Sequence, residues 1–198
     1  MTAAAIQLVD FLDFSATVGP PRVTKVKELK GRDEYHPAFD FYKPLREAIQ
    51  SIVRDGSPVS SLSALLPTLT DEKKIKNYPA LISKYEAKPL PAGTWFDPPI
   101  GKWVAGELTV RVNPDIGLTT DKNLLVVKLY FKSPALTPSG TAAMLYLMRE
   151  SLDLDQNTVP AILDLRTGRL HRPRRAQPDP QVLLAAEAAA FMSIWNAL

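Results

Sequence analysis

Residues 123–131, NLLVVKLYF, form a run of apolar, β-branched and aromatic residues interrupted by one charge, Lys128. Such a run predicts a central β-strand that is covered on both faces. Residues 103–112, WVAGELTVRV, alternate between apolar and polar positions, which predicts a strand with one buried face and a bend or tight turn at Gly106. The segment between them, 113–122, is rich in turn-forming residues. These strands should belong to one sheet.

The elements after this sheet have clear start and stop signals. Thr137 and Pro138 predict the beginning of a helix that runs to about residue 152, with Thr137 as its N-cap. Residues 159–165 predict another strand, followed by a tight turn and a short return strand at 170–171. Residues 181–197 carry apolar side chains at helical spacing and predict a last helix.

The first hundred residues read as mostly helical. The helical pattern covers about 3–15, 38–54 and 59–66, and a further helix begins at Thr70 as N-cap and is broken or restarted by Pro79; residues 22–30 fit a strand or a helix. Residues 89–101 are so rich in proline and glycine that we expect an irregular connector. We therefore expect one domain, 1–198, with a helical N-terminal half (1–100) and a βββαβα core (102–198). Its fold class is α/β (α+β), a mixed central sheet flanked by helices.

Composition excludes several classes of protein. The chain has no cysteine, which rules out a disulfide framework, thiolate zinc sites and a cysteine nucleophile, and suits a reducing compartment. Residues 1–18 have no positively charged start, and two aspartates interrupt their apolar run, so we expect neither a signal peptide nor a membrane span. The chain also has no G-x-S-x-G, G-x-G-x-x-G or P-loop motif. These features predict a cytoplasmic protein.

Positive charge is concentrated in two segments, although the net charge is only +3. Both segments lack the acids that would neutralise them within the same stretch, which suits contacts with phosphate groups. They predict nucleic acid as a partner, while ordinary solvated loop charge is the alternative. The residues concerned are Arg166, Arg169, Arg172, Arg174 and Arg175 in one segment and Lys73, Lys74 and Lys76 in the other.

Asp115 and Lys128 are the residues most suggestive of chemistry. Metal-dependent cleavage of phosphodiesters needs carboxylates that hold a divalent cation and a lysine that orients water. The Pro114-Asp115 pair, the spacing to Lys128 and the order α–β–β–β–α–β resemble the PD-(D/E)XK nuclease superfamily, which has the restriction-endonuclease-like fold. The resemblance covers residues 38–55 and 103–170. It implies Mg²⁺ as cofactor. With this fold, the helical N-terminal half that the pattern predicts would be an extension to the family's core.

The chain departs from the family pattern at Val126, where the second metal-binding acid should stand. The resemblance allows that acid to come from a preceding helix, which makes Glu47 a candidate; Glu107 is another, and the Val127 carbonyl could add a ligand. If neither acid reaches Asp115, the site is an inactive relic. Each residue also has a purely structural interpretation: Asp115 would belong to a turn, and Lys128 would lie at the rim of the sheet with its charge in solvent.

Two hypotheses of function stay open at this point. The first is an Mg²⁺-dependent nuclease, or an inactive relative that binds nucleic acid. The second is a non-enzymatic interaction or scaffold protein with the same fold and a protein partner. DNA versus RNA and the oligomeric state are not encoded in any pattern of the chain. Asp164, an acid inside an apolar strand, should pair with Arg166 or Arg169.

Overall fold

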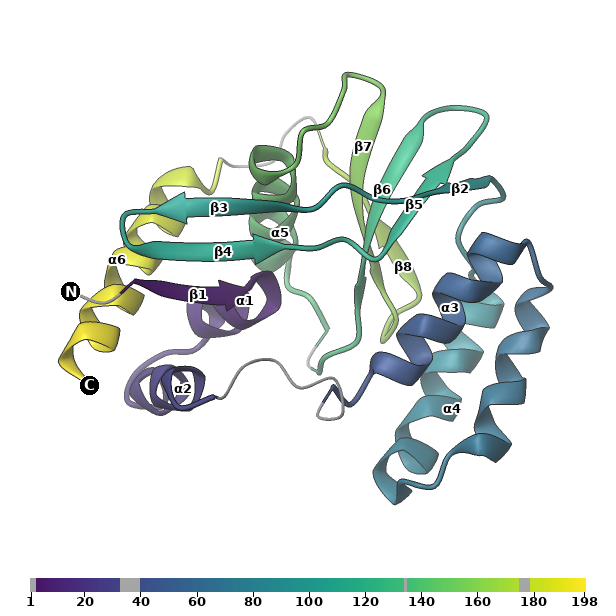
Figure 1. Ribbon diagram of the computed structural model, residues 1–198, viewed down its shortest axis with the longest axis horizontal. Coiled ribbons are helices and arrows are strands. Elements are labelled where there is room, and N and C mark those ends of the chain that lie inside the picture. Colours follow the sequence, from purple (N-terminus) through teal and green to yellow (C-terminus); the bar gives the residue numbers. More distant parts are fainter. Residues whose placement is uncertain (1–2, 33–39, 134, 175–178) are drawn as a thin grey trace.

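The computed structural model describes residues 3–32, 40–133, 135–174 and 179–198. Its helices and strands, among them the 3₁₀ helix η2, form two sheets with helices around them (Figure 1). In chain order they are β1 (Ala4–Gln7), α1 (Leu8–Ala16), α2 (Pro21–Lys30), α3 (Lys43–Asp55), η2 (Val59–Thr68), α4 (Glu72–Ala87), β2 (Thr94–Phe96), β3 (Gly101–Ala105), β4 (Leu108–Val112), β5 (Ile116–Thr119), β6 (Leu124–Tyr130), α5 (Pro138–Ser151), β7 (Thr158–Asp164), β8 (Arg169–His171) and α6 (Gln181–Ala197).

The larger sheet has the strand order β2-β5-β6-β7-β8. Strands β2, β5 and β6 form an antiparallel meander, β7 is parallel to β6, and β8 is antiparallel to β7. A parallel pair needs a crossover connection, which α5 provides between β6 and β7. The expected central strand 123–131 is thus confirmed as β6.

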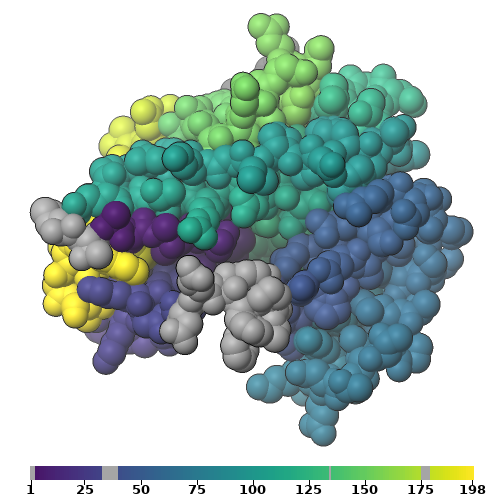
Figure 2. Space-filling view, in the orientation of Figure 1, coloured from purple at the N-terminus to yellow at the C-terminus, as the bar shows by residue number. Residues whose placement is uncertain are grey.

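The two faces of β6 belong to two hydrophobic cores. Leu125, Val127 and Leu129 pack with α3, η2 and α4, whereas Val126 and Tyr130 pack with α5 and the smaller sheet. This split follows from the two-residue period of a strand, which sends neighbouring side chains to opposite faces. In the space-filling view, α3 and α4 form one end of the molecule, and β1 and α6 lie toward the other (Figure 2).

The smaller sheet corrects two predictions. Its order is β1-β4-β3, with β1 parallel to β4, so the first residues of the predicted helix 3–15 form a strand instead. Residues 103–112 form the hairpin of β3 and β4, with Gly106 in its turn at φ 59°, which agrees with the tight turn expected there. A positive φ is available to glycine at little cost, which explains the sharp reversal. This hairpin belongs to the smaller sheet, so 103–112 and 123–131 do not share one sheet as expected.

Other elements differ from the prediction because short strands are stabilised by partners far away in the sequence. The connector 89–101 contains β2, and the segment 113–122 contains β5; the two strands pair with each other. Residues 22–30 are helical as part of α2, and the N-cap of α4 is Asp71, whose carboxylate accepts from the Lys74 N–H. Pro79 lies inside α4 without ending it.

The elements with strong local signals lie where the sequence predicts them. Thr137 caps α5 by accepting from the Gly140 N–H at 3.0 Å, and α6 spans the predicted residues 181–197. The fold class is confirmed at the level of a mixed α and β protein with helices flanking mixed sheets. None of the helices in the described ranges has both the length and the apolar character of a membrane span.

Gly117 should be essential for the contact between β2 and β5. A Cβ atom at this position would lie 2.3 Å from the Phe96 carbonyl oxygen, so Gly117→Ala must push β2 away. We expect a loss of about 1–3 kcal/mol in the free energy of unfolding, measured with urea. Gly31→Ala is the matched control, because its Cβ would meet nothing closer than the Lys27 carbonyl oxygen at 3.4 Å. Equal stability of the two variants would contradict this account.

Candidate functional site

Asp115 and Lys128 meet on neighbouring strands of the five-stranded sheet. Asp115 lies directly before β5, and its N–H donates to the Val127 carbonyl oxygen at 2.8 Å. The ladder pairs Ile116 with Val127, which places Asp115 opposite Lys128. Lys128 Nζ lies 3.0 Å from Asp115 Oδ2 and 3.2 Å from Oδ1. The predicted contact is present, but Asp115 precedes β5 instead of ending the strand before it.

This ion pair is buried and well hydrogen-bonded. The Asp115 side chain is 7% exposed and that of Lys128 is 13% exposed. The Leu129 N–H donates to Asp115 Oδ2 at 2.7 Å, and Lys128 Nζ also donates to the Asn113 carbonyl oxygen at 2.8 Å. Taking either charge out of water is costly unless it is paired and its hydrogen-bonding atoms are satisfied. Each of these two residues supplies the partner that the other requires.

Helix α3 reaches Asp115 with a glutamine at its backbone carbonyl and an arginine near its carboxylate. Gln50 Nε2 donates to the Asp115 carbonyl oxygen at 2.7 Å, and Arg46 Nε lies 3.8 Å from Asp115 Oδ1. Arg46 also forms an ion pair with Asp40. Two carboxylates and two cations, Asp40, Arg46, Asp115 and Lys128, therefore form what we call the Asp115 cluster. Sequence reasoning missed Arg46 and Gln50, and their i, i+4 spacing on one helix face was the available signal.

Neither candidate for the second acid contacts Asp115. Glu47 is 59% exposed and lies 3.6 Å from Lys43, because it is about 100° around the helix from Arg46. Glu107 stands at the turn before β4, and the five residues of that strand separate it from the Asp115 loop by roughly 16 Å. Val126 is fully buried in the hydrophobic core.

The described residues do not fit a magnesium site at Asp115. Mg²⁺ takes an octahedral set of oxygen ligands that usually includes one or two carboxylates. Here the Asp115 oxygens already accept from Lys128 and Leu129, and the Val127 carbonyl accepts the Asp115 N–H. Within the described ranges, no group of three or more acid, histidine or cysteine side chains could hold a metal ion. The positive charge beside Asp115 comes from Lys128 and Arg46.

The same face of β6 carries polar contacts beyond Lys128. Burial, together with the carboxylates of Asp13 and Asp164, raises the pKa of Tyr130 to about 12, so the phenol stays neutral at physiological pH. Two residues on, Lys132 forms an ion pair with Asp13 and lies 3.9 Å from Asp10. These contacts join α1 to the end of β6, as Arg46 and Gln50 join α3 to its neighbour β5.

The arginine segment is divided between an inward and an outward group. Arg166 points inward: its Nε donates to the Phe131 carbonyl oxygen at 2.8 Å and its Nη2 to the Tyr42 hydroxyl at 2.9 Å. Arg175 lies outside the described residues. The exposed arginines of the segment are Arg169, Arg172 and Arg174.

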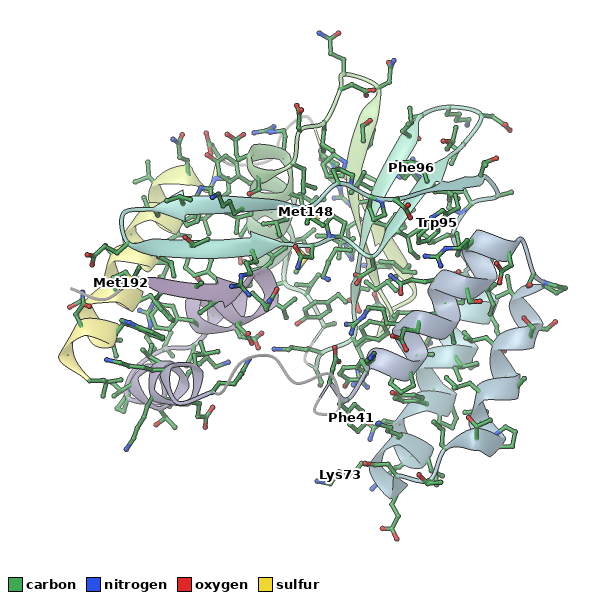
Figure 3. All side chains as sticks on the ribbon, in the orientation of Figure 1. Phe41, Lys73, Trp95, Phe96, Met148 and Met192 are labelled. Carbon is green, nitrogen blue, oxygen red and sulfur yellow. The ribbon has the colours of Figure 1, made fainter. Side chains whose placement is uncertain are left out.

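The lysine segment lies on a different part of the surface. Lys73 and Lys76 are exposed on α4, and Lys74 is half-buried. The turn before β8 contacts the other end of this helix, where a Cβ on Gly168 would lie 3.3 Å from the Lys84 carbonyl oxygen. Lys73 stands eleven residues earlier, roughly 16 Å along the helix axis, at the free end of α4 (Figure 3). The two basic segments therefore do not form one patch.

The remaining residues of interest have structural contacts. Asp164 is 1% exposed, and its Oδ1 accepts the backbone N–H of Arg166 at 2.9 Å, so its partner is the main chain and not a guanidinium. Trp95 lies beside α3 (Figure 3), with the Arg54 guanidinium 4.6 Å from its ring centre. His36 lies outside the described residues.

Comparison with known proteins gives this chain no relatives from which a role could be transferred. No family model matches it, and no curated protein matches it either. The interpretation of the site therefore depends on its own geometry.

Lys128 should contribute far more to stability than an exposed lysine in a comparable pair. Lys128→Met leaves the buried Asp115 carboxylate without its nearest cation, and we expect the free energy of unfolding to fall by about 3 kcal/mol. Lys43→Met breaks the exposed pair with Glu47 and should cost less than about 1 kcal/mol. Urea denaturation of both variants measures the difference. Equal losses would mean that the buried pair has no special weight.

Proposed function

We propose that this chain is a nuclease-like protein of restriction-endonuclease-like fold that binds nucleic acid without cleaving it. The order of elements supports the fold: α3, then β2, β5 and β6, then α5 and β7 reproduce the order α–β–β–β–α–β, with the β3–β4 hairpin inserted after β2. The contact between Asp115, directly before β5, and Lys128 within β6 also supports the proposal, since the motif requires these two residues to meet.

We infer the absence of cleavage from the contacts of the Asp115 carboxylate. A metal-dependent nuclease needs carboxylate oxygens that are open to a cation. In this protein both oxygens of Asp115 are engaged by Lys128 and Leu129, and Arg46 lies 3.8 Å away. An incoming Mg²⁺ would have to displace a buried ammonium group and would meet the positive charge of a guanidinium. The site is built as an internal ion pair.

The part of the proposal that concerns nucleic acid is supported by the outward arginines. Arg169 and Arg172 are exposed and have no ion-pair or hydrogen-bond partner for their side chains within the described ranges. Guanidinium groups bind phosphate through paired hydrogen bonds and need no sequence-specific contacts to do so. The β8 edge thus offers free positive charge, in contrast to the compensated charge at Asp115.

We expect no cleavage of nucleic acid by the wild-type protein. Plasmid DNA, single-stranded DNA and single-stranded RNA are incubated with Mg²⁺ or Mn²⁺ and separated on gels, with a commercial nuclease as positive control. Wild type and Asp115→Asn should both leave all substrates intact, because Asp115 is not available to a metal ion. Cleavage by wild type that disappears in Asp115→Asn would show an active nuclease and overturn the proposal.

Binding should be weak, salt-dependent and reduced by loss of the outward arginines. Fluorescence anisotropy with a labelled oligonucleotide at about 50 mM salt should detect it. Arg169→Ala with Arg172→Ala should lower affinity and flatten the slope of log affinity against log salt by about 1 to 2. The control is Arg111→Ala with Arg149→Ala, which removes the same charge from exposed positions elsewhere. If wild type retains neither DNA nor RNA, nucleic acid is the wrong partner.

A non-enzymatic interaction protein is the second candidate. The separation of Lys73 from the arginine segment favours it, because the two basic segments cannot act as one continuous phosphate-binding surface. The anisotropy experiment separates the two candidates, since only the first requires retention of nucleic acid.

A further inference from the structure

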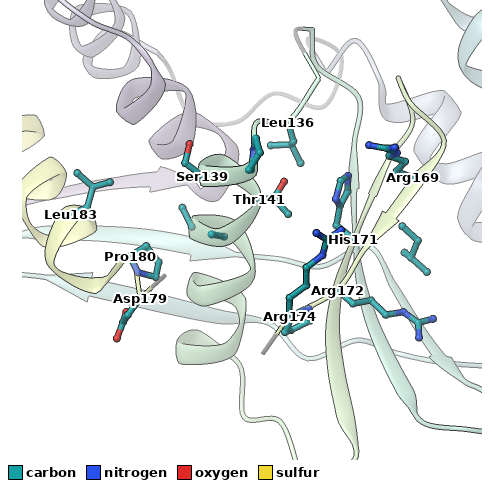
Figure 4. A pocket seen from close by; sticks show the side chains of 15 residues that line it. Leu136, Ser139, Thr141, Arg169, His171, Arg172, Arg174, Asp179, Pro180 and Leu183 are labelled. Atoms are coloured by element: carbon teal, nitrogen blue, oxygen red, sulfur yellow. The ribbon is translucent and has the colours of Figure 1, made fainter. Parts of the chain in front are cut away.

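A large cavity lies between β8 and the first turns of α5 and α6, away from the Asp115 cluster. Its volume is about 1140 Å³, slightly above the range of about 300–1,000 Å³ that is usual for sites that hold small organic molecules. Figure 4 shows Arg169 and His171 on one side of α5 and Leu183 on the other. The lining residues outside the cationic wall are mainly apolar, and they include Leu136, Ala142, Ala143, Leu170, Pro180 and Leu183.

The β8 side of the cavity is cationic. Arg169, Arg172 and Arg174 all line it. No carboxylate within the described ranges lies at ion-pair distance from Arg169. Asp179, the acid in the lining, accepts the backbone N–H of Gln181 at 2.9 Å and so helps to begin α6. Arg169 and Arg172 therefore give the wall positive charge that no described carboxylate neutralises.

His171 adds a polar atom that has no partner. Its Nε2 is buried and makes no hydrogen bond to any described group. Burial lowers the pKa of His171, and the charges of Arg169 and Arg174 lower it further, while Asp164 of β7 acts in the opposite direction. A buried ring nitrogen without a partner is costly. The His171 ring lines the cavity, so a rotation of this ring would bring Nε2 to the head group of a bound ligand and remove that cost.

The first turn of α5 also favours a negatively charged ligand. Thr137 caps the helix, and the side chains of Ser139 and Thr141 belong to the lining. The first N–H groups of a helix carry partial positive charge, which favours an anion nearby. Together with Arg169, Arg172 and His171, this turn makes the end of the cavity complementary to a negatively charged group. The rest of the cavity is complementary to an apolar body.

We propose that this cavity binds a small amphipathic anion, with a carboxylate or phosphate head group against Arg169 and His171 and an apolar body against α5 and α6. The site goes beyond the proposed contact with nucleic acid. No Phe, Tyr or Trp side chain is among the described lining residues, so a base would find no aromatic ring to stack on. Leucine, alanine and proline side chains suit an aliphatic chain instead.

Isothermal titration calorimetry with decanoate and with decyltrimethylammonium tests the proposal, because these probes share the alkyl chain and differ in the charge of the head group. Decanoate should bind saturably, and the cation should bind at least about tenfold more weakly. Arg169→Gln should weaken decanoate binding by about tenfold or more, whereas Arg149→Gln, outside the cavity, should leave it unchanged. Equal binding of both probes, or no binding of either, would overturn the proposal.

Leu183 provides a matched test of the apolar wall. Leu183 and Val182 are neighbours on α6 that are 58% and 83% exposed, and only Leu183 lines the cavity. Leu183→Gln should weaken decanoate binding several-fold, and Val182→Gln should not. Neither change removes a charge, so oligonucleotide binding should stay the same in both variants. If an oligonucleotide displaces decanoate from wild type and Leu183→Gln has no effect, the wall serves nucleic acid and the cavity proposal fails.

Discussion

The buried contact between Asp115 and Lys128 is the constraint on which the arrangement of layers depends. It joins β5 to β6, and through Gln50 and Arg46 it also fixes α3 against the edge of the sheet. A shift of the β5–β6 pairing by one residue would turn Asp115 toward the apolar core of α3 and α4, away from its cation. The apolar residues around it can pack in more than one way, but the charged pair has one favourable register. The ion pair therefore specifies the pairing that hydrophobic burial stabilises.

Elements with strong local sequence signals were predicted correctly, whereas strands that depend on a distant partner were not. β6, α5 and α6 have local signals, namely an unbroken apolar run, a Thr-Pro helix start and a helical period, and all three were predicted correctly. β1, β2 and β5 are three or four residues long and lie in segments that read as helix, connector and turn. A strand that short is stabilised by the partner it pairs with, and the partner of β1, β4, lies a hundred residues away. No local pattern could identify it.

The candidate site shows the same limit at the scale of a helix. The spacing of Asp115 and Lys128 predicted that they would meet, and the idea that the preceding helix approaches Asp115 was also correct. What the sequence could not supply was the rotation of that helix. Arg46 faces the Asp115 carboxylate and Gln50 its backbone carbonyl, whereas Glu47, one residue after Arg46, faces solvent. Neighbouring residues on a helix point about 100° apart. This rotation decides whether a second acid or a second cation reaches Asp115. The difference reverses the electrostatics of the site.

Some charged side chains of this protein are paired within the fold, and others face the surface without a described partner. The segment from Asp164 to His171 contains both kinds. Arg166 is held by Phe131 and Tyr42 on the inside, where all of its contacts are to groups of the chain itself. Three residues later, after the turn at Gly168, Arg169 emerges at the cavity without a partner among the described residues. Fixed positive charge that a protein does not neutralise internally remains available to an external anion. We therefore expect anions to bind at β8. The ion pairs that stabilise the fold lie on the other side of the turn at Gly168.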